Sequence, residues 1–283
     1  MRIDDLTLAG AGQTARELAE RAGVEIRTLR DDEAEPAAQV LADIWQTTLG
    51  AGPIEAALLI AFLHTDNYVA GAFADGEMVG VCVGFYASAG SSLHSHIAGV
   101  RDGWVGRGVG TAMKFHQRAW AIRHGIGSIS WTFDPLVARN AYFNVHRLGA
   151  RVTRYAADFY GVMSDGLNDG QASDRLLVSW DVTVEPGAHA AVIQPPDPRV
   201  FPALQMDRAF QPVLRPGVPG DEVEQCRVAV PEDVELLRTR DPDLATTWRY
   251  AAREALGRLL GAGWVVTDFD RTDGCYLLER NDS

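Results

Sequence analysis

The stretch that most constrains the fold is residues 91–114, SSLHSHIAGVRDGWVGRGVGTAMK. Its first part, Ser92–Val100, is rich in β-branched and apolar residues and predicts a strand. A glycine-rich turn over residues 103–110 follows. Apolar residues at helical spacing then predict a helix from near Gly108 to His124. The chain must therefore join a strand to a helix N-terminus through a tight, glycine-rich turn.

This turn is a candidate anion site. The first backbone N–H groups of a helix have no partner inside the helix, and the helix dipole favours negative charge there. Gly106, Gly108 and Gly110 alternate along the turn, and Arg101 and Arg107 add positive charge. The pattern favours a phosphate cradle over an ordinary strand-to-helix turn. It does not by itself distinguish a nucleotide from a cofactor that carries a pyrophosphate.

Composition limits the partners of the chain. With 283 residues, 47% of them hydrophobic, it can bury one large core or two modest ones. The net charge of -12 argues against nucleic acid as a partner, whereas a local basic patch suits a small anion. The N-terminus shows no secretory signal, and no apolar run is long enough to span a bilayer. We therefore expect a cytoplasmic protein without a membrane partner.

The cysteines indicate neither a disulfide framework nor a zinc site. Cys82, Cys226 and Cys275 are odd in number and lie far apart, with no C-x-x-C spacing. We expect them to be buried free thiols, and no metal site is predicted.

The hydrophobic pattern predicts alternating helices and strands up to about residue 182. Expected helices cover residues 14–21, 31–49, 54–64 and 139–148, and expected strands cover residues 24–29, 68–74, 78–86, 128–133, 152–160 and 176–182. Eight prolines between residues 186 and 219 then suggest a linker with a short element or two that cross over the first domain. We predict a main domain over residues 1–183, a linker or crossover over 184–222, and a small α/β unit over 223–283. That last unit is expected to pack on the main domain or on a second copy of the chain, as a homodimer.

The order of these elements resembles the GNAT superfamily of coenzyme A-dependent N-acyltransferases. In that family a strand ending in Val leads into Q/R-x-x-G-x-G/A, whose backbone amides hold the pyrophosphate of acyl-CoA. The matching stretch here is Val105-Gly106-Arg107-Gly108-Val109-Gly110, preceded by Val100, with Val105 in place of the usual Gln or Arg. A Rossmann cradle would instead follow the first strand of its unit and carry G-x-G-x-x-G.

The resemblance covers about residues 24–182 and implies an α/β (α+β) fold. Its central sheet would be mixed but mostly antiparallel, with helices on both faces, and the small C-terminal α/β unit lies outside it. Gly149-Ala150 resembles the Gly-Phe pair that closes the next helix of the family. Within residues 131–180, the stretches WTFDPL, RNAYFN, LGA, DFYG and DRLLVSW resemble a less-characterised bacterial branch of the superfamily. Some members of that branch are associated with N-acylation of amino acids, including succinyl transfer.

The resemblance implies acetyl-CoA or another acyl-CoA as co-substrate. In the family, the strand before the cradle splays from its neighbour, and its exposed amides receive the thioester oxygen and the pantetheine arm. Asn140 is a displaced substitute for a family Asn, whose position holds Ala138 here. The residues implied to contact the cofactor are Ile97, Ala98, Val100, Arg101, Val105, Gly106, Arg107, Gly108, Val109, Gly110, Thr111 and Asn140.

Acyl transfer to an amine also requires a proton acceptor. The family often places a Glu on the strand before the cradle, and none stands between Gly80 and Val100. His96, or as second choice His94, is the candidate base, because residues two apart on a strand share a face. A purely structural role for both histidines is an equal alternative. The family's acidic Tyr is replaced by Val145, which leaves Tyr142 as the predicted catalytic phenol, with Tyr160 as an alternative and a core role open for both.

Trp131 and Asp134 end the strand that would face His96 across the splay, and we assign them to the acceptor amine. Asp134 precedes a proline, so a turn or cap role competes with that assignment. A carboxylate on the acceptor or acyl group would need an arginine, with Arg147, Arg154 and Arg175 as candidates.

The sequence thus predicts an N-acyltransferase that moves an acetyl or succinyl group from acyl-CoA to a primary amine of a small molecule. An amino acid is the expected acceptor, and the amine would attack the thioester directly. The alternative is a non-catalytic acyl-CoA-binding or scaffold module with a degenerate GNAT fold. The missing Glu, the missing Tyr and the Val105 departure favour that alternative.

Overall fold

The computed structural model describes residues 5–47, 52–88, 92–161, 172–185, 192 and 194–281. The chain forms two compact units. The first comprises the chain up to Trp131 together with Asp181–Glu185, and the second comprises the other described residues. Each unit combines strands with packed helices, which confirms the predicted α/β class. None of the described helices is both long and apolar enough to cross a bilayer.

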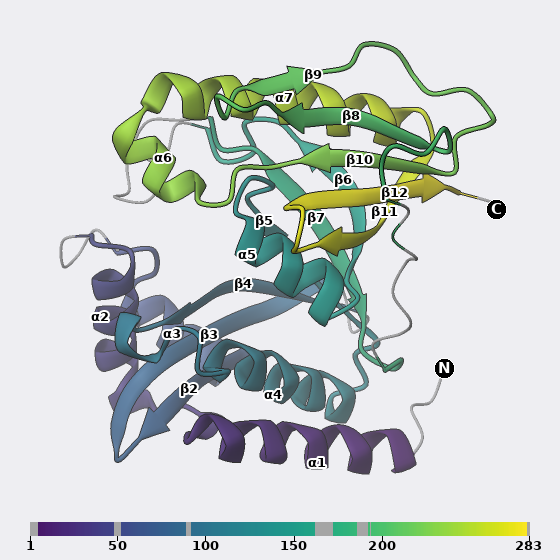
Figure 1. The fold of residues 1–283 in the computed structure, drawn as a ribbon. Helices are drawn as coiled ribbons and strands as arrows, with labels where there is room; N and C mark the ends of the chain where they lie inside the picture. Colours follow the sequence, from purple (N-terminus) through teal and green to yellow (C-terminus); the bar gives the residue numbers. More distant parts are fainter. Residues whose placement is uncertain are drawn as a thin grey trace. The chain divides into compact units, whose positions relative to one another are not determined.

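The first unit is built on five consecutive strands of a mixed sheet (Figure 1). β1 to β4 are antiparallel neighbours, whereas β4 and β5 run parallel. The last two residues of β5 belong to the second unit. The strands are β1 (Glu25–Thr28), β2 (Tyr68–Ala74), β3 (Glu77–Ser88), β4 (Ser92–Val100) and β5 (Ser128–Phe133), and the α-helices are α1 (Asp5–Ala22), α2 (Ala34–Ile44), α3 (Ala56–His64) and α4 (Val109–Arg123).

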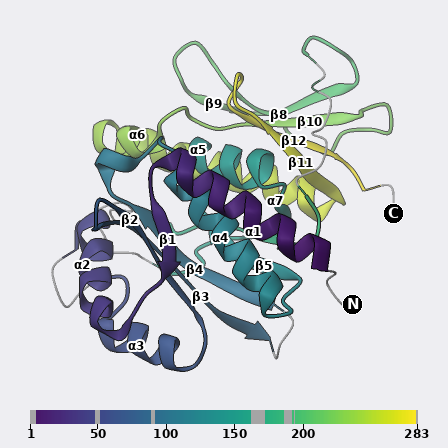
Figure 2. The ribbon, with the colours of Figure 1, turned by 90° about the horizontal axis from the view of Figure 1, so that it is seen from below.

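Helices cover both faces of this sheet, as β2 shows. Successive strand residues point to opposite faces, and every residue of β2 is buried. Val69 and Phe73 belong to a core that includes residues of α2 and α3. Tyr68 points the other way, where its hydroxyl lies 3.0 Å from Nδ1 of His116 in α4. Helix α1 packs along α4 on that second side (Figure 2).

Helix α1 is longer than the sequence predicts. The residues up to about Gly23 were expected to be helical or loosely attached, with a short helix over residues 14–21. The helix continues through Gly10 and Gly12, since Ala11 and Ala15 are buried on one face and extend the stripe.

The second unit contains a β-hairpin, a five-stranded sheet and several helices. The sheet has the order β11-β12-β10-β8-β9, with β8 and β10 parallel and the other neighbours antiparallel. Helix α7 contacts β8, β9, β10 and β11. The elements are α5 (Ala138–Ala141), the π-helix η3 (Tyr142–Arg147), β6 (Arg151–Ala156), β7 (Arg175–Asp181), β8 (Val200–Met206), β9 (Pro212–Leu214), β10 (Gln225–Ala229), α6 (Val234–Arg240), α7 (Pro242–Gly261), β11 (Trp264–Asp270) and β12 (Cys275–Arg280).

Strands β8 and β9 lie in the segment that was predicted as a linker. Val200, Ala203 and Leu204 are buried, so β8 contributes to the core despite the prolines around it. Pro202 lies opposite Arg227, immediately before a register shift between β8 and β10. Proline is tolerated in a strand at such irregularities. Proline density alone was therefore a poor guide to a linker here.

The compact units differ from the predicted domain boundaries. The division falls inside β5 near Trp131, and not near residue 183. The C-terminal elements pack on residues of the same chain, because β11 contacts both η3 and β6, and α7 contacts β6. Packing on a main-domain segment was one of the two predicted options for these elements. A homodimer remains a prediction.

Candidate functional site

The first unit contains a fork between two parallel strands. β4 and β5 pair only at Ser92 with Ser128, Leu93 with Ile129 and His94 with Ser130. β4 nevertheless continues to Val100 and β5 to Phe133. From Ser95 onward, β4 has no paired residue on β5 within the described residues. The predicted splay is therefore present, and it leaves a backbone edge of β4 that includes Ile97, Ala98 and Val100.

A β-bulge lies where the fork opens. On the opposite edge of β4, Ser95 pairs with Gly84 and Ile97 pairs with Val83, which leaves His96 as the extra residue. Bulges bend a strand and redirect its side chains, and they are frequent beside active sites. Ile97 packs its side chain on the core that includes α2 and α3. Gly99 has no room for a Cβ atom, which would lie 2.6 Å from the Trp45 ring.

The two candidate histidines share a face of β4, as predicted. Their ring centroids are 6.1 Å apart, and the Phe85 ring lies 5.2 Å from His94 and 5.7 Å from His96. Burial lowers the pKa of both imidazoles, and the charges of His96 and Lys114 lower that of His94 further. Both rings are therefore neutral at pH 7 and can accept a proton.

A buried lysine that the sequence analysis did not predict lies on the opposite face of β4. Lys114 of α4 donates from Nζ to Oγ of Ser95 at 2.7 Å and to Oε1 of Gln117 at 3.2 Å. The same Nζ lies 4.0 Å from the centroid of the Trp131 ring. Burial lowers the pKa of Lys114 to about 8. Trp131, predicted to bind the acceptor, is itself buried and packs on this ammonium.

The glycine-rich turn has the geometry of an anion cradle. Gly106 and Gly108 have φ angles of 81° and 89°, which glycine adopts readily. Gly108 is the N-cap of α4, and its carbonyl accepts from the Ala112 N–H at 2.9 Å. In the described part of the chain, no backbone carbonyl accepts from the N–H groups of Val109, Gly110 or Thr111. These amides are therefore available to an anion.

The side chains around the cradle are either exposed to solvent or turned toward the protein. Val105, where the family has Gln or Arg, is 58% exposed. Arg107 is exposed and lies over the Trp104 ring at 4.8 Å. Arg101 is turned toward the protein, because its Nε donates to the Met78 carbonyl at 3.2 Å and its Nη2 lies 3.3 Å from Asp43 Oδ2. Arg107 is thus the better placed of the two predicted arginines.

The second unit holds Asp134, and its contacts do not favour the predicted acceptor role. Arg249 donates to Oδ1 at 2.6 Å and to Oδ2 at 2.7 Å, and Arg238 donates to Oδ2 at 2.5 Å. The Leu136 N–H also donates to Oδ1, as expected of a turn former. Burial alone would raise the pKa of Asp134, but the hydrogen bond and charge of Arg249 and the charge of Arg238 lower it to about 2. The carboxylate therefore anchors α6 and α7.

The other predicted residues of the second unit lie in α5, η3, β6 and β7. Tyr142 opens η3 and stacks on His146, with ring centroids 4.7 Å apart and an interplanar angle of 18°. Asn140 is half-buried in α5. Of the candidate carboxylate partners, Arg147 and Arg154 are exposed, whereas Arg175 is buried and lies 5.3 Å from the Tyr160 ring centroid. The roles of all these residues stay predictions.

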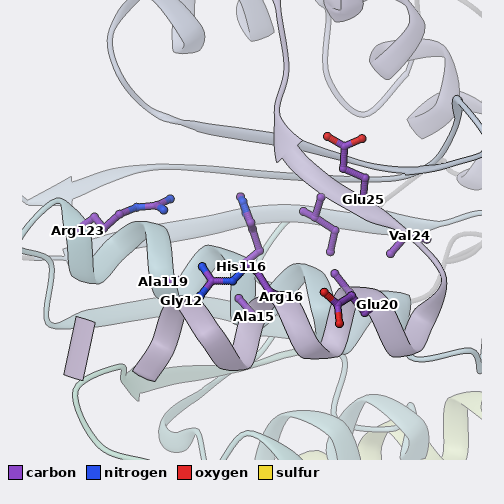
Figure 3. Close-up of a pocket in the computed structure, with 11 residues that line it drawn as sticks. Gly12, Ala15, Arg16, Glu20, Val24, Glu25, His116, Ala119 and Arg123 are labelled. Atoms are coloured by element: carbon purple, nitrogen blue, oxygen red, sulfur yellow. The ribbon is translucent and has the colours of Figure 1, made fainter. Parts of the chain in front are cut away.

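A separate pocket of about 410 Å³ lies between α1, β1 and α4 (Figure 3). None of the predicted site residues lines it. His116 on its wall is neutral at pH 7, because burial and then the charge of Arg123 lower its pKa to about 4. Within the described ranges, no three His, Cys, Asp or Glu side chains gather as metal ligands would. Cys82, Cys226 and Cys275 are buried and unpaired, as predicted.

No protein-family model matches the sequence, and no curated protein matches it. Several solved structures are similar. A GNAT family acetyltransferase from Elizabethkingia anophelis with acetyl-CoA bound is 14% identical, and the match covers 56% of this chain and 98% of that one with a TM-score of 0.45. The ribosomal-protein-S18-alanine N-acetyltransferase from Escherichia coli is 15% identical, covering 60% and 99% at a TM-score of 0.46. Aminoglycoside 6'-acetyltransferase type Ii is 14% identical, covering 57% and 99% at 0.45. Over somewhat more than half its length, the chain is similar to solved acetyltransferases, including members of the GNAT family.

Proposed function

We propose that the chain is a GNAT-type N-acyltransferase. It would move an acetyl or succinyl group from acyl-CoA to the primary amine of a small molecule, with an amino acid as the expected acceptor. The observation that carries this proposal is the fork between β4 and β5, which leads directly into the cradle of Gly106, Gly108 and the α4 N-terminus. Paired parallel strands would leave no open backbone edge beside an anion site.

The residues present fit an acyl-CoA molecule at two points. The free amides of Val109, Gly110 and Thr111 suit a pyrophosphate, and Arg107 can add charge from the exposed side. A Cβ atom at Gly106 or Gly110 would meet nothing within 4 Å, so the space over the turn is open. The edge of β4 beyond His94 offers amides to a carbonyl oxygen, which gains negative charge as the amine attacks.

The proton chemistry needs a neutral base on the protein. His96, with His94 as second choice, would accept the proton of the acceptor ammonium, because its lowered pKa keeps it neutral. The amine nitrogen then bonds to the acyl carbon and gives its second proton to water, the carbon–sulfur bond breaks, and the thiolate takes a proton from Tyr142 or from water. Solvent finally takes the proton from His96 and, where Tyr142 has donated, returns one to its phenolate.

A non-catalytic acyl-CoA-binding module is the second candidate. It is favoured by Val145, which is buried at the position where the family places its phenol. Such a module would keep the cradle and lack turnover.

Thermal shift with acetyl-CoA, succinyl-CoA and free CoA tests the binding half of the proposal. A ligand at 100 times its dissociation constant should stabilise the protein by about 2.7 kcal/mol. Gly108→Ala should abolish the shift, because alanine is strained at a φ of 89° and the cradle amides would move. Gly125→Ala is the matched control: its φ is 72°, it follows the other end of α4, and an added Cβ meets nothing within 4 Å, whereas at Gly108 it meets only Ala22 Cβ at 3.9 Å.

Equal loss of the CoA shift in both glycine variants would contradict the cradle assignment, and no shift in the wild type would contradict the proposed function. Turnover separates the two candidates: release of free thiol from the acyl-CoA that shifts most, with a panel of amino acids as acceptors. Binding without thiol release would favour the non-catalytic module.

A further inference from the structure

The pocket between α1, β1 and α4 has no part in the proposed acyl transfer (Figure 3). Its walls belong to the first unit alone, and no residue of the fork or of the cradle lines it. Helix α1 also precedes the part of the chain that resembles the GNAT family. The volume of about 410 Å³ is in the range typical of small-molecule sites. The pocket is therefore a candidate for a second ligand.

The inner wall of the pocket is apolar. Ala15 of α1, Ala119 of α4 and Val24 line it, and all three are buried. An alanine side chain ends at Cβ, so neither helix fills the groove between them. A Cβ atom added at Gly12 would meet only Arg16 Nη1, at 3.6 Å. A ligand that fits this wall needs an apolar body, whose surface it would remove from water.

Two arginines and two glutamates line the same pocket with exposed side chains. Arg16 and Glu20 are four residues apart on α1, a spacing at which opposite charges often pair. Arg16 instead donates to Oε1 of the neutral Gln13, at 2.8 Å. Among the residues that the structure describes, Glu20 and Arg123 have no hydrogen-bond or ion-pair partner. Their charges are therefore available to a ligand.

The arrangement of these charges indicates the class of ligand. In Figure 3, Arg123 and Arg16 lie toward one end of the pocket, and Glu20 and Glu25 lie toward the other. A purely anionic ligand would meet two glutamates, and a purely cationic one would meet two arginines. A zwitterion satisfies both ends. From Arg16 to Glu20 the helix rises about 6 Å, close to the length of about 7 Å that an extended dipeptide spans.

We propose that this pocket binds a small zwitterion with an apolar body, of the size and chemistry of an apolar dipeptide. The carboxylate of the ligand lies at the arginines, its ammonium lies at the glutamates, and its side chains contact the apolar wall. His116 also lines the pocket, and its Nδ1 lies 3.0 Å from the Tyr68 hydroxyl. Its other ring nitrogen, Nε2, is thus left for the peptide group of the ligand. The site is separate from the proposed acyl-CoA site.

Isothermal titration calorimetry of the full chain with leucyl-leucine tests this proposal. N-acetyl-leucyl-leucine lacks the ammonium, and leucyl-leucine amide lacks the carboxylate. We expect leucyl-leucine to bind and each blocked form to bind at least tenfold more weakly, because each loses one pair of charged partners. Free leucine carries both charges on one carbon atom and should also bind at least tenfold more weakly. A blocked form or leucine that binds as tightly as leucyl-leucine would overturn the inference.

Variants at the rim locate the bound dipeptide. Glu20→Gln and Arg123→Met should each weaken leucyl-leucine at least tenfold. The matched controls are Glu17→Gln and Arg21→Met: both residues are on α1, pair with each other at 3.7 Å and do not line the pocket. Their affinities should stay within twofold of the wild type. Unchanged affinity in Glu20→Gln and Arg123→Met, or no binding by the wild type at millimolar dipeptide, would overturn the inference. The CoA thermal shift, which tests the proposed function, is independent of all these outcomes.

Discussion

Asp134 gives a prediction about stability that can be developed from its contacts. Its carboxylate binds Arg238 of α6 and Arg249 of α7, with donor–acceptor distances between 2.5 and 2.7 Å. Both guanidinium groups are buried, and so is the carboxylate. Asp134→Asn keeps the shape of the side chain and an acceptor for the Leu136 N–H. It removes the negative charge that compensates the two arginines, and we therefore expect a large loss of stability in the second unit.

Two independent arguments give the size of the expected loss of unfolding free energy. A fall in the pKa of Asp134 from its ordinary 3.8 to about 2 corresponds to about 2 kcal/mol of folding free energy at neutral pH. Removing one partner of a buried ion pair typically costs about 3–5 kcal/mol, because the remaining charge is left uncompensated. We expect Asp134→Asn to lower the free energy of unfolding by about 3 kcal/mol at pH 7.

Urea denaturation at pH 7, followed by tryptophan fluorescence, measures this loss. Asp197→Asn is the matched control, because the neighbouring Arg199 also lowers the pKa of Asp197 to about 2, yet this pair is exposed to solvent. Solvent screening makes exposed pairs weak, so the control should unfold close to the wild type. A loss below about 1 kcal/mol for Asp134→Asn, or equal losses in both variants, would refute the reasoning.

Two further predictions concern stability. Lys114→Met should be more stable than the wild type at pH 7, because the buried ammonium has a pKa of about 8, below its ordinary 10.5. Wild-type stability then rises as pH increases from 8 to 10.5, so the difference in urea midpoint should narrow across that window; a constant difference would argue against a titrating Lys114. Leu256→Ala in α7 should lower the unfolding free energy by about 2–5 kcal/mol, since Leu256 is fully buried. Leu236→Ala, at a side chain that is 44% exposed, should change it far less, and similar urea midpoints for the two variants would contradict the packing of α7.

The sequence predicted correctly the strands that are marked by their own apolar residues and by the turn residues that follow them. β2, β4 and β5 have the predicted bounds, because alternating or continuous apolar residues end at turn residues such as Asp75-Gly76 and Asp134-Pro135. The cradle was also predictable, since Gly106 and Gly108 adopt the positive φ angles that only their residue type accepts readily. β8 was expected only as a short element of unspecified type, because its burial depends on β9 and β10 pairing on either side of it, and no local pattern reports such pairing.

Side-chain roles were predictable only where partners are close in sequence. His94 and His96 share a face because they are two residues apart on one strand. The hydrogen-bond partners of Asp134, Arg238 and Arg249, are more than 100 residues away in the sequence. The residues around Asp134 therefore could not indicate that its carboxylate binds two arginines. Lysine is almost never fully buried unless it is paired, so the sequence did not predict that Lys114 would be buried.

The hydrogen bond between His146 and Asp268 was also unpredictable from the sequence. His146 lies in the π-helix η3, and Asp268 lies beside a β-bulge in β11. Regular α-helical and strand periodicities assign a side chain to a face, but a π-turn and a bulge each shift that assignment by one residue. Sequence periodicity therefore fails at the two places where this pair is formed, and 122 residues separate them. An irregular helix and an irregular strand are both required to place the carboxylate on Nδ1. The Asp268 carboxylate holds His146 against the Tyr142 ring and also accepts from the Phe269 N–H. Asp268→Asn should therefore lower the urea midpoint of the protein, and an unchanged midpoint would show that this pair does not stabilise the fold.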